Sequence, residues 1–95
     1  MQIPIDEILL EHEEVKQKVV GRNIVRLLQG KEFDPISVLY CHHLEKYLLS
    51  DGHHRLAAYY CLKKRTIEGE IESCTNYECK GDWHKLTTKE FRFIK

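Results

Sequence analysis

The segment Tyr47-Leu48-Leu49-Ser50-Asp51-Gly52-His53-His54-Arg55-Leu56-Ala57-Ala58 has the most informative pattern in the chain. It predicts a strand over residues 46–50 that passes through an Asp-Gly turn directly into a helix, whose last turn is expected to contain Lys63, Lys64 and Arg65. The run Ile36-Ser37-Val38-Leu39-Tyr40 lies just before it and has the length and β-branched content of another strand. We expect these two strands to pair as a hairpin.

The segments on either side of this hairpin predict a further helix and further strands. Between Glu14 and Gln29 the apolar residues recur in steps of three and four, which predicts a helix that Gly30 ends. The inward stripe of this helix is predicted to contain Val15, Val19, Val20, Ile24, Leu27 and Leu28. Residues 3–5 read as a short extended piece, with a turn from Asp6 to Leu10 after them. Residues 66–72 alternate apolar and polar positions, as a half-buried strand does. These elements predict an α+β fold.

The composition describes one small domain. The chain has 95 residues, and its 15 basic and 15 acidic residues give a formal net charge of zero. The chain as a whole therefore does not attract nucleic acid or an anionic membrane electrostatically, and recognition of an anion requires a local site. We expect the core domain to span residues 1–73 and a tail over residues 74–95 to pack on it. Neither a signal peptide nor a membrane span is visible, which predicts a cytoplasmic protein.

The four cysteines, Cys41, Cys61, Cys74 and Cys79, are expected to be unlinked, because a chain without a secretory signal stays in a reducing compartment. Cys61 lies in the apolar helical stretch after residue 52 and is expected to be a buried thiol. A zinc site that uses Cys74, Cys79 and His84 is an alternative. Its fourth ligand would come from Asp82, His42 or His43.

The turn from Gly52 to Arg55 has the features of a phosphate site. The first main-chain N–H groups of a helix lack intrahelical partners, and a glycine lets a ligand come close to them. His53, His54 and Arg55 add cationic or hydrogen-bonding groups, although positive charge is disfavoured at this end of a helix. A sequence selected for stability alone would place Asp or Glu there. The other interpretation is that Asp51 only caps the helix and that the histidines are solvated.

The order of these segments resembles the ParB/sulfiredoxin superfamily over about residues 3–72. The resemblance is carried by Ile3-Pro4-Ile5-Asp6, Pro35-Ile36-Ser37-Val38-Leu39, the Asp51–Ala58 segment and Lys64-Arg65-Thr66-Ile67. In that family a Gly-x-x-Arg box, here Gly52 to Arg55, binds the phosphates of ATP, ADP or CTP. Sulfiredoxins have a nucleophilic cysteine where this chain has His53, so sulfiredoxin activity is not expected. The chain also lacks the arginine-rich motif and the helix-turn-helix domain of partition-type ParB proteins.

The motif Asp51-Gly52-His53-His54-Arg55 is most similar to the free serine kinase branch. That branch has a His-Glu pair after its first strand, which His12-Glu13 resembles, and the resemblance makes Glu13 a candidate catalytic base. Glu11 and Glu14 flank the pair, and the whole run can also be read as the acidic start of a helix.

The resemblance thus implies a domain that binds ATP or ADP with Mg²⁺. If the chain is an enzyme, it would transfer a phosphoryl group to a small hydroxyl compound such as free serine. Glu13 would accept the hydroxyl proton, His53, His54 and Arg55 would hold the phosphate, and Asp51 would cap the helix or order Mg²⁺. The alternative is a nucleotide-sensing or DNA-associated module without turnover. The basic cluster Lys63-Lys64-Arg65 is the feature that is compatible with DNA binding.

Overall fold

The structure, a computed structural model, describes residues 1–10, 14–42, 44–73, 86–87 and 91–95. Its elements are β1 (Gln2–Pro4), the 3₁₀ helix η1 (Ile5–Glu7), β2 (Ile8–Leu10), β3 (Glu14–Lys16), α1 (Gln17–Leu28), β4 (Ile36–Cys41), β5 (Lys46–Asp51), α2 (His53–Cys61), β6 (Thr66–Ser73), β7 (Leu86–Thr87) and β8 (Arg92–Ile94). This is the α+β fold that the sequence predicts.

The described strands form a sheet in the order β1-β6-β4-β5-β2-β7 and a separate pair, β3-β8. The predicted hairpin is present, because β4 and β5 pair antiparallel. β6 then returns parallel to β4, with α2 making the crossover, and β2 pairs parallel with β5. The sheet is therefore mixed, and its central strands are the ones that the local sequence pattern identifies.

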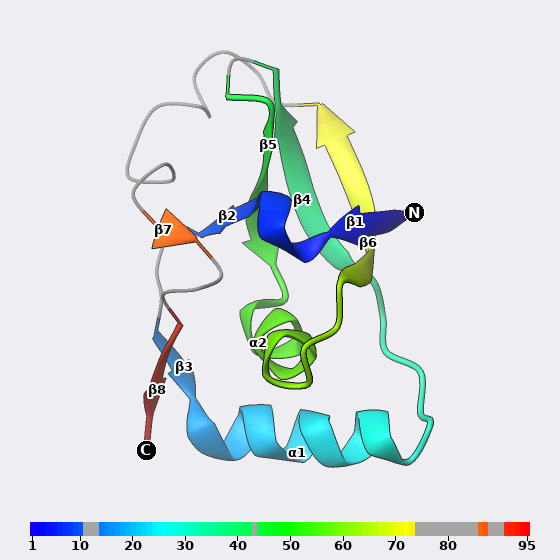
Figure 1. Cartoon of the computed structure of the whole chain (residues 1–95), viewed down its shortest axis with the longest axis vertical. Helices are drawn as coiled ribbons and strands as arrows, with labels where there is room; N and C mark the ends of the chain where they lie inside the picture. The colour runs from blue at the N-terminus through cyan, green and yellow to red at the C-terminus, as the bar shows by residue number, and fades with distance from the viewer. Residues whose placement is uncertain (11–13, 43, 74–85, 88–90) are drawn as a thin grey trace.

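The two helices are stacked on one side of the sheet. Figure 1 shows α2 between the sheet and α1, which lies at one end of the molecule. The main core cluster fills the space between sheet and α2 with Ile3, Ile5, Ile8, Leu10, Ile36, Val38, Leu49, Leu56 and Ile67. Ala57 and Ala58, both fully buried, face Val15 and Val20 in a second cluster. The small side chains on α2 let α1 approach closely.

The first helix begins later than its apolar periodicity predicts. Residues 14–16 form β3, which pairs parallel with β8 near the C-terminus, and α1 starts at Gln17. Val15 is buried, as the helical pattern predicts, but it lies on a strand and not on a helix. The local pattern could not show this, because the partner strand β8 lies near the other end of the chain. The helix continues without a break through Gly21 to Leu28. Leu28 itself, predicted to face inward, is 72% exposed.

Two other local predictions were wrong. Residues 8–10, expected in a turn that begins at Asp6, form strand β2, because β5 and β7 offer it partners on both sides. The basic residues 63–65 were expected in the last turn of the second helix, but α2 ends at Cys61. The chain leaves the helix through a Schellman motif in which the N–H of Lys63 bonds to Tyr60 and that of Lys64 bonds to Tyr59.

The cysteines also differ from expectation. Cys41 is fully buried at the end of β4 and is disulfide-bonded, so the prediction of four unlinked thiols was wrong. Its partner is not among the described residues. The prediction used the redox compartment alone, which carries no information about whether two thiols are brought together by the fold. Cys61 is free, but it is exposed on the last turn of α2 and not buried as predicted. Cys74, Cys79 and His84, the candidates for zinc, lie outside the described residues.

Candidate functional site

Gly52 forms the hinge between β5 and α2. Its φ of 107° lies in the left-handed region that favours glycine, and it serves as the N-cap of the helix. A Cβ atom at this position would come within 2.5 Å of Cγ2 of the buried Ile36. The main-chain oxygen of Gly52 accepts the first helical hydrogen bond, from the N–H of Leu56 at 2.8 Å. The fold itself thus requires glycine here. The turn places the N-terminus of α2 at the C-terminal end of β5, which lies between β4 and β2 in the sheet.

A register shift between Ser37 and Val38 lies beside this turn. It occurs in the pairing of β4 with β5, just where Ser37 is opposite Asp51. Such irregularities re-aim the residues at the end of a strand. Here the bulge sits where β5 ends and Asp51 leads into the helix.

Arg55 links three segments of this region. Its Nη1 donates hydrogen bonds to the main-chain oxygens of Asp34 and Pro35 at 2.8 and 3.1 Å, and its Nη2 donates to Oδ2 of Asp51 at 3.0 Å. The guanidinium therefore joins α2 to the segment that leads into β4. The side chain of Arg55 is 21% exposed, so part of it faces solvent.

Asp51 does not cap the helix, because the N-cap is Gly52 and no side chain caps α2. The capping interpretation is therefore wrong. The carboxylate is 76% exposed and forms its ion pair with Arg55, four residues later. An exposed pair of this kind contributes little to stability, about 0–1 kcal/mol. The carboxylate thus lies at the start of the turn with most of its surface facing solvent.

The two histidines occupy the first turn of α2. His54 accepts a hydrogen bond at Nε2 from the main-chain N–H of Lys16, at 3.0 Å. Lys16 is the N-cap residue of α1, and α1 has no side-chain cap, so His54 supplies an acceptor to the start of that helix. Nε2 of His53 is buried. Neither histidine is a solvated surface residue of the kind that the alternative interpretation requires.

An open cavity of about 640 Å³ lies over this turn. Its volume is in the range of small-molecule sites, about 300–1,000 Å³. Five of the six sequence-predicted site residues line it, namely Asp51, Gly52, His53, His54 and Arg55. The sixth, Glu13, lies outside the described residues. Its neighbour Glu14 lines the cavity from β3.

The remaining walls come from α1 and from the segment before β4. They contribute Val19, Asn23, Arg26, Glu32, Phe33 and Asp34. The guanidinium of Arg26 lies over the ring of Phe33, 5.2 Å from its centre. Sequence reasoning missed these residues, because no local pattern shows that α1 and residues 32–34 border the start of α2.

The cavity is not electropositive. Four carboxylates and two guanidinium groups line it, so the lining residues carry a formal charge of −2 when the histidines are neutral. A phosphate group would face repulsion from the carboxylates unless a divalent cation came with it. Among the described residues, no three metal-ligating side chains cluster. Single carboxylates could still hold Mg²⁺ that is also bound to phosphate oxygens, because Mg²⁺ commonly takes only one or two protein carboxylates.

Solved structures of other proteins have this architecture. Sulfiredoxin from Arabidopsis thaliana superimposes with a TM-score of 0.69 at 21% identity, over 83% of this chain and 90% of that one. The chain has the ParB/sulfiredoxin-like fold. A conserved hypothetical protein from Pyrococcus furiosus matches with a TM-score of 0.69 at 24% identity, over 77% of this chain and 32% of its own. A protein from Agrobacterium tumefaciens matches with a TM-score of 0.64 at 14% identity, over 83% and 43%.

The chain thus spans nearly all of the sulfiredoxin but less than half of the other two proteins. No protein-family model and no curated protein sequence matches it. Identities of this size establish the ParB/sulfiredoxin-like fold alone, because one fold hosts many activities.

A second, smaller cavity lies at the opposite end of α2. Its volume is about 450 Å³, and it is lined by Ile5, Asp6, Tyr60, Cys61, Lys63, Lys64 and Arg65. The basic cluster of residues 63–65 therefore lies at the far end of the helix from the Gly52–Arg55 turn. No helix in the described part of the chain is long and apolar enough to span a membrane.

Proposed function

We propose that the chain binds ATP or ADP together with Mg²⁺ in the cavity at the N-terminus of α2. The observation that carries this proposal is the coincidence of a ligand-sized cavity with the strand–glycine–helix turn of Asp51 to Arg55. Main-chain N–H groups and the positive end of the helix dipole favour phosphate at such a turn.

The residues around the turn fit the two parts of a metal-bound phosphate. The guanidinium of Arg55 and the first turn of α2 suit phosphate oxygens, because Arg offers a planar set of N–H donors. The exposed carboxylate of Asp51 suits Mg²⁺, which would also offset the negative charge of the lining. On the far wall, Phe33 with Arg26 over its ring offers an aromatic surface of the kind on which a purine base stacks.

If the chain is an enzyme, it transfers the terminal phosphoryl group of the nucleotide to a small hydroxyl compound and releases ADP from ATP, or AMP from ADP. Free serine is the first acceptor to test. Such a reaction mainly requires positioning and charge stabilisation, plus a carboxylate to accept the hydroxyl proton. Glu13 is the proposed base from sequence resemblance, and its neighbour Glu14 is one of the two glutamates, with Glu32, that line the cavity. His54 and Arg55 would hold the transferred group.

The test is calorimetric titration of the protein with ATP and with ADP, each with and without Mg²⁺. We expect binding that requires Mg²⁺, because the carboxylate-rich lining repels free polyphosphate. A nucleotide at 100 times its Kd should also raise the free energy of unfolding by about 2.7 kcal/mol. Absence of binding by either nucleotide at millimolar concentration with Mg²⁺ would contradict the proposal.

Arg55 variants locate the site, provided that folding is separated from binding. Arg55→Ala removes three internal hydrogen bonds as well as a phosphate contact, so its effects are mixed. Arg55→Lys keeps a positive charge but loses the planar fork, and we expect it to weaken nucleotide binding by about 1.5 kcal/mol or more. Lys64→Ala, at the other end of α2, is the control. If Arg55→Lys folds and binds both nucleotides as tightly as the control, the nucleotide lies elsewhere.

The non-catalytic alternative predicts a different pattern in the same assays. Tight nucleotide binding without consumption in the presence of any hydroxyl acceptor would indicate a sensing module. A DNA mobility shift that weakens as salt increases would favour the DNA-associated form of that alternative, and Lys64→Ala should then reduce the shift.

A further inference from the structure

The outer face of α1 combines apolar and basic residues that the fold does not use. We define this face by Lys18, Gly21, Arg22, Val25 and Leu28. Val25 and Leu28 are 52% and 72% exposed, and with Gly21 they follow the i, i+4, i+7 spacing of one helix stripe. The stripe lies about 100° around the helix from Val20, whose side chain packs against α2, and Lys18 and Arg22 lie on the side opposite Val20. In Figure 1, α2 covers α1 on its inner side only.

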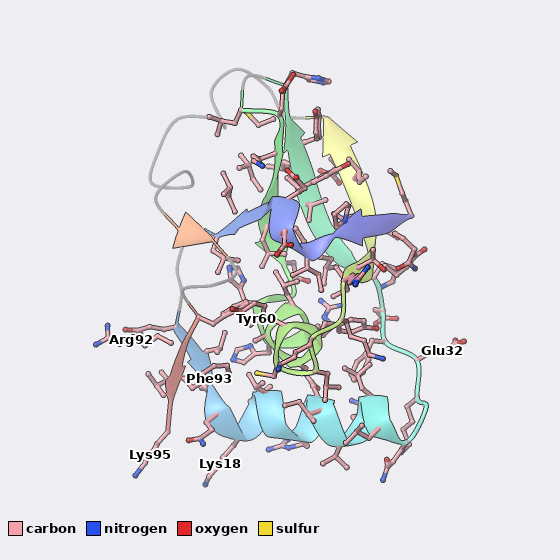
Figure 2. All side chains as sticks on the ribbon, viewed as in Figure 1. Lys18, Glu32, Tyr60, Arg92, Phe93 and Lys95 are labelled. Atoms are coloured by element: carbon pink, nitrogen blue, oxygen red, sulfur yellow. The ribbon has the colours of Figure 1, made fainter. Side chains whose placement is uncertain are left out.

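A basic stripe runs beside the apolar one. Lys18 and Arg22 are exposed and one helical turn apart, and the sidechain of Lys18 projects from the outer side of α1 in Figure 2. The helix contains three basic residues and no acidic one, although the whole chain is neutral. Within the described part of the chain, neither Lys18 nor Arg22 forms an ion pair. The face thus has local positive charge next to exposed apolar surface.

Gly21 is a glycine that this fold does not explain. It lies in the interior of α1, where glycine costs about 0.5–1 kcal/mol relative to alanine. A Cβ atom there would meet nothing within 4 Å, in contrast to the crowded Gly52. A glycine within the apolar stripe and next to the basic one permits another helix to approach the backbone closely.

From these three observations we infer that the outer face of α1 binds an amphipathic helix of a partner protein, one that presents apolar residues flanked by Asp or Glu. Helix pairs of this kind bury apolar stripes and place opposite charges beside them. A second copy of this chain does not fit, because two such faces would bring Lys18 and Arg22 against like charges. A membrane surface fits poorly, because the face has two large apolar side chains and no aromatic residue.

The test uses a synthetic helical peptide with leucine along one face flanked by glutamate, labelled for fluorescence anisotropy. A control peptide has each glutamate replaced by glutamine. We expect the acidic peptide to bind, the control peptide to bind more weakly, and the affinity to fall as salt increases. On the protein, Arg22→Glu and Leu28→Ser should each weaken binding by about tenfold or more. Lys64→Glu, a charge reversal remote from α1, should leave the affinity unchanged.

Gly21→Gln separates the interface from folding. Glutamine is a good helix former in open space, so the variant should be at least as stable as the wild type and yet bind the peptide more weakly. Failure of the wild type to bind the acidic peptide at millimolar concentration would overturn the inference, as would equal affinities of Arg22→Glu and Lys64→Glu. It would also be overturned by a dimer in sedimentation that Leu28→Ser dissociates, or by tighter binding to phosphatidylserine vesicles than to the peptide. None of these outcomes depends on the nucleotide.

Discussion

His54 and Lys16 join the two helices at the candidate site: Nε2 of His54 accepts a hydrogen bond from the main-chain N–H of Lys16 at 3.0 Å. Lys16 is the N-cap of α1, and His54 lies in the first turn of α2. The contact fixes the start of one cavity wall against the proposed phosphate turn. It also requires an imidazole with a free lone pair at Nε2, which a protonated ring does not have.

We predict that His54→Ala weakens this joint. The loss of one hydrogen bond between partly exposed groups should lower the free energy of unfolding by about 0.5–1.5 kcal/mol in urea titrations. Amide exchange of Lys16 should accelerate, while that of Leu56, whose N–H bonds to Gly52, should change much less. His54→Gln offers an oxygen acceptor and should recover part of the loss. Unchanged exchange at Lys16 in His54→Ala would show that the contact does not hold α1.

Gly52 and Gly21 should respond to alanine with opposite signs. At Gly52 the positive φ and the 2.5 Å approach to Ile36 make any side chain strained, and we expect Gly52→Ala to destabilise the protein by about 1–3 kcal/mol. At Gly21 the space is open and the backbone is helical, so Gly21→Ala should stabilise it by about 0.5–1 kcal/mol. Thermal and urea unfolding of the two variants measure both effects. The same sign for both would contradict the geometry.

The ends of the two helices supply another matched pair. α1 ends at a Schellman motif with Gly30 at φ 75°, and α2 ends at one with Lys63 at φ 58°. The left-handed conformation is strained for lysine and unstrained for glycine. Lys63→Gly should therefore stabilise the protein by about 0.4–1 kcal/mol. Gly30→Lys should destabilise it. A decrease in stability for Lys63→Gly would mean that the lysine side chain makes a compensating contact.

How far the sequence predicts this fold depends on where each strand finds its partner. β4, β5 and α2 are consecutive, and their turn chemistry is local, so the segment from Ile36 to Ala58 was predicted nearly to the residue. Strand β3 was predicted as part of a helix, because its pairing partner, β8, lies near the other end of the chain and leaves no local signal. The prediction that Leu28 faces the core was wrong, because helical periodicity cannot distinguish a core stripe from a wider apolar surface. The same holds for the site, where the Asp51–Arg55 turn was found and the Arg26–Phe33 wall was not.

The cysteines should divide into protected and reactive groups. Unfolded protein that has not been reduced should take up two fewer alkyl groups than reduced protein, because Cys41 is in a disulfide. In the folded protein, partial burial raises the pKa of the Cys61 thiol. Its alkylation should therefore need a higher pH than that of the same thiol in unfolded protein. The folded state binds this proton more tightly, so the contribution of Cys61 to stability declines as pH rises past the unfolded value. The intact mass after alkylation gives the number of free thiols. The same measurement as a function of pH, with Cys61→Ser as the reference, gives the pH at which Cys61 reacts.

The proposed phosphoryl transfer needs a carboxylate that accepts the proton of the hydroxyl group. The alternative interpretation, an acidic helix start, is wrong for Glu14, because α1 begins at Gln17 and its first turn has no acidic residue. Glu14 lies on β3, exposed, and lines the cavity. Neither Glu13→Gln nor Glu14→Gln should then weaken folding through a helix dipole, and their melting temperatures should stay close to that of the wild type.

Turnover should separate these two glutamates. With free serine and Mg²⁺–nucleotide, the variant that lacks the base should lose about a hundredfold or more in kcat while its nucleotide Kd is unchanged. The other variant should keep its rate and serves as the control. The resemblance to the serine kinase branch favours Glu13, and the cavity wall favours Glu14. Serine-dependent turnover that survives in both variants would exclude both glutamates as the base, and Glu11 would be the next carboxylate to replace.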